Sequence, residues 1–375
     1  MARPQTAGDA TEERDLVSSW CTQDPAIESW LSDLIRVGTS TDDSILLLGQ
    51  TGTGKSFLAY QIHKLWARQK GDVDNRKFET VNCAGLTPAL AHSQLFGHKK
   101  GSFTGATHDQ EGAAKRANRG TLFLDEIGDL NAEVQGYLLH ALENKEIFPL
   151  GAQKPERTEF RLICATNRDP SALVWERSFR MDLYARIRHW VFRLPALADR
   201  RGDLPLLVNH FHKIVTEERK CNVSFAKDAM ERYLAFAQSA EATWEGNIRD
   251  LKQSVSRLVS AAILRGGEVI NVGLVNEEIC RLRDQWRQEQ DKGSDLYRML
   301  LDRRNSRRPD MGLCDATELL LLEQGLEAHS GNMAAAAKEL YGVESQRQTK
   351  TNPTTMFRRK VARLKRKYPA ERIAL

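Results

Sequence analysis

The eight residues GQTGTGKS, at positions 49–56, constrain the fold of this chain more than any other stretch. They fit the pattern G-x4-G-K-S/T, follow the apolar run SILLLG and open the helical stretch SFLAYQIHKLW. In such a loop, backbone N–H groups and the positive end of the following helix can bind phosphate oxygens. The pattern predicts a strand, a phosphate-binding loop and a helix, in that order. The competing interpretation is an ordinary glycine-rich turn, which the flanking strand and helix disfavour.

The residues of this loop have separate expected roles. Lys55 is expected to reach the β- and γ-phosphates of a nucleotide, and the Ser56 hydroxyl is expected to coordinate Mg²⁺. The other loop residues predicted to bind the nucleotide are Gly49, Gln50, Thr51, Gly52, Thr53 and Gly54.

The second half of the site is predicted at the ends of two apolar runs. TLFLDE, at 121–126, ends in Asp125 and Glu126, and FRLICATN ends in Asn167. Open α/β sheets bind their ligands outside the carboxyl ends of the strands. We therefore expect Asp125 to hold Mg²⁺, Glu126 to polarise an attacking water and Asn167 to sense the γ-phosphate. The alternative is an exposed acidic pair, which the neighbouring phosphate loop disfavours.

Five short apolar runs alternate with helical stretches along the first part of the chain. They span residues 44–49, 78–83, 121–126, 160–167 and 190–195. Buried strands separated by helices predict an α/β fold with a parallel sheet covered on both faces. Residues 204–283 have a helical pattern without a strong strand candidate, so a smaller helical subdomain is expected to follow.

Composition limits the class of protein. The 375 residues allow two or three domains, and 28% charged with 41% hydrophobic residues is an ordinary globular balance. No apolar run approaches the roughly 18 residues that span a bilayer, and the first residues lack the apolar region of a signal peptide. The six cysteines are scattered without a CxxC pair, which indicates reduced thiols in a cytoplasmic protein.

Positive charge is concentrated at the C-terminus. Residues 331–375 hold eleven Lys and Arg against three Asp and Glu, a net charge of +8, whereas the whole chain carries +5. The other 330 residues therefore sum to −3. Such a distribution is typical of a chain with a nucleic-acid-binding end.

The segment FGHKKGSFTGATHDQ, at 96–110, contains three glycines that permit tight turns, Gly97, Gly101 and Gly105. Loop tips are normally polar, yet this one carries Phe103. Two interpretations remain open at this point. Either the phenyl ring folds back into the core, or the loop grips another macromolecule.

From about residue 24 to 285 the chain closely resembles the AAA+ domain of bacterial enhancer-binding proteins, the sigma-54-dependent transcription activators. The resemblance rests on the nucleotide motifs above and on four further stretches in the family's order. These are VNCAGL, GSFTGA (GAFTGA in the family), FRMDLYARI and WEGNIRDL.

The resemblance implies roles for further residues. Asn82 would couple the nucleotide state to the catalytic Glu126, and Arg180 and Arg186 would be arginine fingers. Arg249 would be the lid arginine that contacts the nucleotide, although Glu245 stands where the family usually has Pro. The loop that contacts the partner would comprise Gly101, Ser102, Phe103, Thr104, Gly105 and Ala106.

For the whole protein, the resemblance implies an ATP-hydrolysing homo-oligomer, expected to be a hexameric ring with ATP and Mg²⁺ at its interfaces. A finger from one subunit would act on the nucleotide of its neighbour. Hydrolysis would drive the GSFTGA loops against sigma-54 RNA polymerase to open a promoter. Two alternatives are kept: a AAA+ ATPase that remodels another client protein, and a DNA-binding repressor that uses ATP only for assembly.

A finer resemblance, in EIFPLGAQK and in the stretch from ERYLAFAQ to RLV, is to the activators of RNA-repair operons. Those activators carry a large N-terminal sensor domain. Only about 25 residues precede the ATPase segment here, so we expect that sensor to be absent from this chain. Either the chain is truncated or a separate sensor protein regulates it.

At the C-terminus, GNMAAAAKELYGV (331–343) resembles the start of a Fis-type helix-turn-helix, and residues 354–367 would form its recognition helix. The intervening ESQRQTKTNP is longer than the usual turn. Contacts to enhancer DNA are expected from Arg358, Arg359 and Arg363. The alternative is a basic tail that binds polyanions without sequence specificity.

These patterns predict that the chain is divided into five segments. They are a disordered or linker N-terminus (1–23), an α/β ATPase subdomain (24–200), a helical lid (201–285), a linker (286–314) and a DNA-binding domain (315–375).

Overall fold

The computed structural model describes residues 20–71, 75–103 and 105–286. Backbone contacts divide the chain into a unit Met1–Arg283 and a unit Asp284–Leu375, and the described residues belong almost wholly to the first. The predicted linker, apart from Trp286, and the predicted helix-turn-helix lie outside the described residues.

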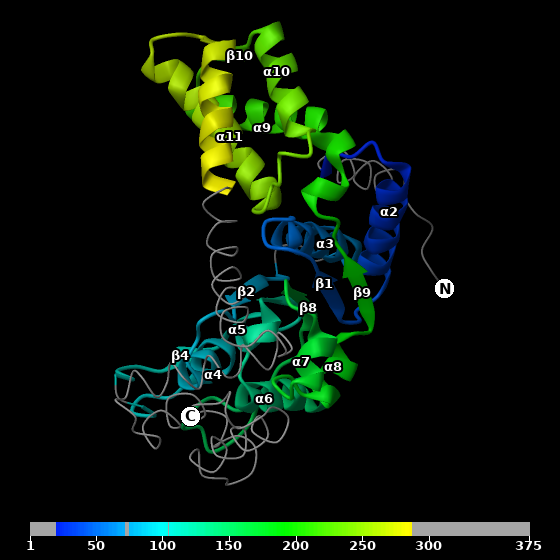
Figure 1. Ribbon diagram of the computed structural model, residues 1–375. Coiled ribbons are helices and arrows are strands. Elements are labelled where there is room, and N and C mark those ends of the chain that lie inside the picture. The colour runs from blue at the N-terminus through cyan, green and yellow to red at the C-terminus, as the bar shows by residue number, and fades with distance from the viewer. Residues whose placement is uncertain (1–19, 72–74, 104, 287–375) are drawn as a thin grey trace, which may run out of the picture. The chain divides into compact units, whose positions relative to one another are not determined.

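The centre of the first unit is a five-stranded parallel sheet (Figure 1). All five apolar runs form strands of this sheet, in the spatial order β2-β5-β8-β1-β9. The strands are β1 (Ile45–Leu48), β2 (Phe78–Asn82), β5 (Thr121–Asp125), β8 (Arg161–Thr166) and β9 (Trp190–Arg193). The prediction of a parallel sheet is thereby confirmed.

Two apolar layers cover the two faces of the sheet, as the continuous apolar runs require. Successive side chains of a strand point to opposite faces, so Ile45 and Leu47 pack into one layer while Leu46 and Leu48 pack into the other. The first layer is completed by α2 (Pro25–Ser40) and α3 (Lys55–Gln69). The second is completed by α4 (Pro88–Phe96), α5 (Ala113–Arg116), α6 (Ala132–Asn144), α7 (Pro170–Trp175) and α8 (Met181–Ile187).

Several short elements connect this framework. β3 (Gly97–His98) pairs antiparallel with β4 (Gln110–Glu111), and Gly101 and Gly105 lie between the two strands. β6 (Glu146–Ile147) pairs antiparallel with β7 (Glu156–Arg157). The 3-10 turns are η1 (Ile127–Asp129), η2 (Leu197–Asp199) and η3 (Arg201–Asp203).

Residues after η3 form the predicted helical subdomain. Its helices are α9 (Leu204–Arg219), α10 (Lys227–Ala237) and α11 (Asn247–Leu264), and residues 272–286 are also helical. Tyr233 and Trp244 are fully buried in its core, where the Tyr233 hydroxyl donates to Ser254 Oγ (2.8 Å). A two-residue parallel pair, β10 (Ser224–Phe225) with β11 (Val269–Ile270), was not predicted because so short a pair leaves no period-2 pattern. Within the described part of the chain, no helix is long and apolar enough to cross a membrane.

Candidate functional site

The phosphate loop connects the carboxyl end of β1 to the first turn of α3. Gly52 and Gly54 have φ of 79° and 103°, a left-handed conformation that favours glycine. Lys55 Nζ donates to the carbonyl oxygens of Gly49 (2.8 Å) and Gln50 (3.1 Å). Burial lowers the pKa of this lysine, although the carboxylates of Glu126 and Asp125 oppose the shift. The sequence therefore places a buried ammonium group at the helix N-terminus, where phosphates bind.

The acidic pair lies at the end of β5, beside the loop. Ser56 Oγ donates to Asp125 Oδ2 (3.0 Å), and the Glu126 carboxylate lies 3.8 Å from Lys55 Nζ. Glu126 has a φ of 51°, so the chain turns sharply directly after the strand. Asn167, directly after β8, holds the Glu126 carboxylate, because its backbone N–H donates to Glu126 Oε2 (3.0 Å). Five residues from three separate stretches of the sequence thus meet at one edge of the sheet.

A cavity of about 210 Å³ lies among these groups. Arg249, from the start of α11, lines it together with Lys55, Ser56 and the acidic pair. The Asn167 amide also reaches the loop, where Nδ2 donates to Thr51 Oγ1 (3.2 Å). Lining residues therefore come from the phosphate loop, β5 and the lid.

Asn82 is adjacent to this site but turned into its own loop. Its Cα is paired with that of Asp125 across strands β2 and β5. The side-chain oxygen Oδ1 accepts from the backbone N–H of Ala84 (3.0 Å). In this conformation Asn82 caps the turn that follows β2.

Among the described residues, no group of three or more His, Cys, Asp or Glu side chains is arranged to hold a metal ion. Mg²⁺ is usually bound in nucleotide sites by one or two protein oxygens together with phosphates and water. The Ser56 hydroxyl and the Asp125 carboxylate, 3.0 Å apart, are such a donor set. The two residues predicted to hold Mg²⁺ therefore have the right chemistry and proximity.

Asn247, whose role the sequence did not reveal, ties the lid to the phosphate loop. It is fully buried, and Nδ2 donates to Gln50 Oε1 (3.1 Å) and to the carbonyl oxygen of Thr51 (3.0 Å). The backbone N–H of Ile248 donates to the Gly52 oxygen (3.1 Å). At Gly52 an added Cβ would lie 2.1 Å from the Gly246 oxygen, so only glycine permits this approach. A signal was available, because the asparagine belongs to the WEGNIRDL stretch.

Residues 20–23 differ from the prediction of a disordered or linker N-terminus for 1–23. Trp20 and Cys21 are buried, with exposures of 3% and 8%. The Trp20 ring stacks on the ring of Phe57, with the ring centroids 6.4 Å apart, and it covers Gly54. The large apolar surface of a tryptophan explains why this segment packs against the phosphate loop rather than remaining in solvent.

The two candidate arginine fingers lie at the two ends of α8, and neither lines the nucleotide cavity of its own chain. Arg180 directly precedes the helix and forms an ion pair with Asp182 (2.7 Å). Arg186 lies in the last turn, where Nη2 donates to the Leu142 oxygen (3.3 Å). Both side chains are at least partly exposed.

The GSFTGA loop is a tight turn at the tip of the β3–β4 hairpin. Gly101 N–H donates to the Ala106 oxygen (2.9 Å), and Ala106 N–H donates to the Phe103 oxygen (3.0 Å). Gly101 and Gly105 have φ of 82° and 102°. Phe103 is 40% exposed, and its ring forms a T-shaped contact with His98, with the ring centroids 5.0 Å apart. The phenyl ring therefore does not fold into the core, while Thr104 lies outside the described residues.

Comparison with known proteins agrees with this geometry. Residues 21–193 match the sigma-54 interaction domain, and residues 198–292 match the AAA+ ATPase lid domain. The transcriptional regulatory protein RtcR of Escherichia coli is 37% identical over 351 residues, which are 93% of this chain and 63% of RtcR. The DNA-binding transcriptional regulator NtrC of Azospirillum brasilense is 36% identical over 279 residues, 74% of this chain and 54% of NtrC.

A solved structure is also similar. NtrX of Brucella abortus in complex with ATP has a TM-score of 0.57 and 26% sequence identity, covering 95% of this chain and 72% of NtrX. The chain spans about half to two thirds of the length of the curated relatives. The first match contains the phosphate loop and the acidic pair of the cavity, and the second contains Arg249 of the lid. The chain belongs to the AAA+ family of sigma-54-dependent transcriptional regulators.

Proposed function

We propose that this protein is an ATP-hydrolysing transcription activator that remodels sigma-54 RNA polymerase at promoters. The observation that carries the proposal is the convergence of Lys55, Glu126 and Arg249 on one cavity, in a chain that also exposes Phe103 at a hairpin tip. The first group provides the chemistry of nucleotide hydrolysis. The second provides a contact surface that an enzyme acting on ATP alone does not need.

Within the site, each residue has a physical task. Lys55 neutralises the β- and γ-phosphates, and the loop N–H groups bind their oxygens. Ser56 and Asp125 would hold Mg²⁺, which neutralises charge on the phosphates when bound. The Glu126 carboxylate orients and polarises the attacking water, while Asn167 holds that carboxylate and contacts the loop. Arg249 would report the nucleotide to the lid.

The exposed arginines of α8 support an assembly in which active sites are shared. Arg180 and Arg186 lie outside the nucleotide cavity of their own chain, so a neighbouring subunit is the natural recipient. An arginine supplied in trans can raise phosphoryl-transfer rates by about 10³–10⁵. A closed ring, hexameric in this proposal, gives every subunit such a neighbour.

The remaining proposed interactions involve the hairpin and the C-terminus. Residues 101–106 contact sigma-54 when the nucleotide site is occupied. Residues 315–375 bind enhancer DNA, with Arg358, Arg359 and Arg363 at the recognition helix. The lid ends near residue 285, and a charged linker joins it to this DNA-binding domain.

One experiment tests the central claim. The purified chain is mixed with purified sigma-54 in the presence of Mg²⁺ and ADP with a metal fluoride, which together imitate the transition state. Co-elution from a sizing column is expected with the fluoride and not with ADP alone. If ATP is hydrolysed but sigma-54 is never retained, the client is a different protein.

A further inference from the structure

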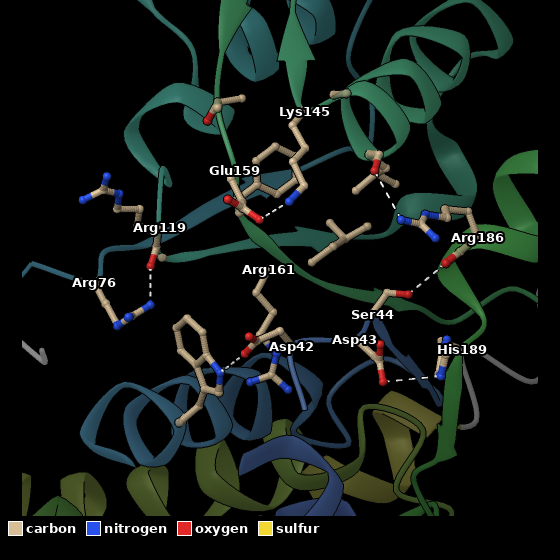
Figure 2. Close-up of a pocket in the computed structure, with 17 residues that line it drawn as sticks. Asp42, Asp43, Ser44, Arg76, Arg119, Lys145, Glu159, Arg161, Arg186 and His189 are labelled. Carbon is tan, nitrogen blue, oxygen red and sulfur yellow. Dashed lines mark hydrogen bonds and ion pairs between the residues drawn. The ribbon is translucent and has the colours of Figure 1, made fainter. Parts of the chain in front are cut away.

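A second cavity, of about 410 Å³, lies at the edge of the sheet opposite to the phosphate loop (Figure 2). Because the strands are parallel, the residues that precede them gather at this amino edge. Asp42, Asp43 and Ser44 precede β1, and Arg161 begins β8. The volume falls within the range of small-molecule sites, about 300–1,000 Å³. None of its lining residues belongs to the nucleotide cavity.

The most unusual group at this cavity is the Arg161 side chain. Arg161 is 4% exposed, and its Nε, Nη1 and Nη2 have no hydrogen-bond partner among the described residues. Burial lowers the pKa of the guanidinium to about 10, against the attraction of Asp42 and Asp43. Buried polar groups almost always have partners, and an unpaired one calls for an unseen water or ion. The guanidinium therefore needs acceptors that the described side chains do not supply.

Three cations, Arg161 among them, lie against the ring of Trp66. The Arg161 guanidinium lies 5.3 Å from the centre of the Trp66 ring, and that of Arg76 lies 4.9 Å from the same ring. The Lys70 ammonium lies 5.9 Å from the centre of the Trp66 ring. Arg76 Nε is likewise buried without a partner in the described structure. Positive charge thus accumulates around one indole ring.

The carboxylates that line the cavity are already engaged. Asp42 accepts hydrogen bonds from Trp66 Nε1 (2.7 Å) and Lys70 Nζ (2.8 Å). The other two lining carboxylates are paired as well, Asp43 with His189 and Glu159 with Lys145. Within the described residues, four lining arginines form no ion pair with a carboxylate: Arg76, Arg119, Arg161 and Arg186. The cavity therefore has an excess of guanidinium groups over free carboxylates.

We propose that this cavity binds a small molecule bearing a phosphate group, whose oxygens supply the acceptors that Arg161 and Arg76 lack. A guanidinium presents a planar fork of donors that matches phosphate oxygens, and such charge-assisted bonds are about twice as strong as neutral ones. A dianion also offsets the excess positive charge. Inorganic phosphate and a phosphate monoester share this chemistry, and they differ in how much of the cavity they fill.

Occupancy of this cavity is connected to α8. Arg186 lines the cavity, and its backbone oxygen accepts from Ser44 Oγ (2.9 Å) at the cavity wall. If the proposed function holds, a bound phosphate would act on a residue assigned to the neighbouring active site. The binding proposal itself does not depend on that role.

The test is a calorimetric titration of the full chain, saturated with ADP to fill the phosphate loop. Inorganic phosphate and ribose 5-phosphate are the two probes. Arg76→Gln and Arg119→Gln should each weaken binding about tenfold, the loss of about one charge-assisted hydrogen bond. Arg36→Gln removes an exposed guanidinium of α2 outside the cavity and serves as the matched control. Uptake that persists in Lys55→Ala comes from a site other than the phosphate loop.

Tighter binding of ribose 5-phosphate identifies a monoester as the ligand, and equal binding identifies free phosphate. Arg161→Gln should abolish uptake if the variant folds; if it does not fold, the Arg76 and Arg119 variants decide. The absence of uptake by the unaltered chain would mean that water satisfies these guanidiniums, and the proposal would be wrong. Uptake that is unchanged in both the Arg76 and Arg119 variants would overturn it equally.

Discussion

The side-chain nitrogen of Asn247 donates to the backbone oxygen of Thr51 across 3.0 Å, joining the first residue of the lid helix α11 to the phosphate loop. Oδ1 of the same side chain accepts from the backbone N–H of Leu197 (2.8 Å). The asparagine has a φ of 54° and no exposed surface. This buried amide therefore fixes the start of α11, and with it Arg249, relative to the loop.

We expect Asn247→Asp to weaken ADP binding about tenfold or more. The substitution keeps the size and the acceptor Oδ1 but removes the donor, so oxygen faces the oxygens of Gln50 and Thr51. Breaking a buried hydrogen bond in this way costs about 1–3 kcal/mol. Calorimetric ADP affinity and thermal unfolding together measure the effect. Asn276→Asp, at an exposed position of the same subdomain, is the control. Wild-type ADP affinity in Asn247→Asp would show that the hydrogen bonds from Asn247 to the phosphate loop do not support nucleotide binding.

Lys55→Ala and Glu126→Gln should separate nucleotide binding from hydrolysis. Removing the Lys55 ammonium leaves the phosphates without a buried positive charge, so ATP affinity should fall. Glu126→Gln preserves the shape that Asn167 holds but weakens polarisation of the water. That variant should bind ATP with near-normal affinity and turn over at least about a hundredfold more slowly. Normal turnover in Glu126→Gln would show that another group activates the water.

The sequence was sufficient to predict the sheet and most of the nucleotide site. A four-residue apolar strand followed by GQTGTGKS leaves few conformations for the loop, and parallel strands bring Asp125 and Asn167 to one edge. The role of Asn247 was not predictable, because its partners Gln50 and Thr51 lie 197 and 196 positions away. Arg161 was missed for a similar reason. It begins an apolar strand, and only the fold shows that its three side-chain nitrogens are buried without partners in the part of the chain that the structure describes.

Arg180 and Arg186 should act on a neighbouring subunit. We expect each Arg→Ala variant to lose most ATPase activity alone. Mixing Arg186→Ala with Lys55→Ala should restore part of the activity, because some hybrid interfaces pair an intact loop with an intact finger. Turnover measured across mixing ratios reports this rescue. Mixed assemblies that form, verified by a tag on one variant, and yet recover nothing would indicate a role within the same chain.

Acid should destabilise the fold through His63. Burial lowers the pKa of this imidazole to about 4, and the charge of Arg161 adds to the shift. Below about pH 6.5 the unfolded chain takes up a proton that the folded chain does not. The free energy of unfolding should therefore fall as pH decreases from 6.5 towards 4, by at most about 1.4 kcal/mol per pH unit.

Urea unfolding at pH 7, 6 and 5 measures this slope. His63→Gln removes the titrating group and should flatten the dependence, whatever its effect on stability at pH 7. The exposed His108→Gln should keep it. An unchanged slope in His63→Gln would assign the acid sensitivity to other groups.

The hairpin tip yields the last prediction. Phe103 is 40% exposed on a turn closed by the Gly101–Ala106 hydrogen bond, so its ring adds little to the core. Phe103→Ala should therefore leave thermal stability within about 0.5 kcal/mol and retain ADP binding. The exposed ring is instead suited to a partner, where an aromatic anchor can supply about 2 kcal/mol of binding free energy or more.

We expect Phe103→Ala and Thr104→Ala to hydrolyse ATP but to lose retention of sigma-54 in the presence of ADP and metal fluoride. Leu90→Ala, another exposed apolar position, is the matched control and should retain sigma-54. Loss of folding or of ADP binding in Phe103→Ala would mean that the ring supports the hairpin through His98, and the partner surface would have to lie elsewhere.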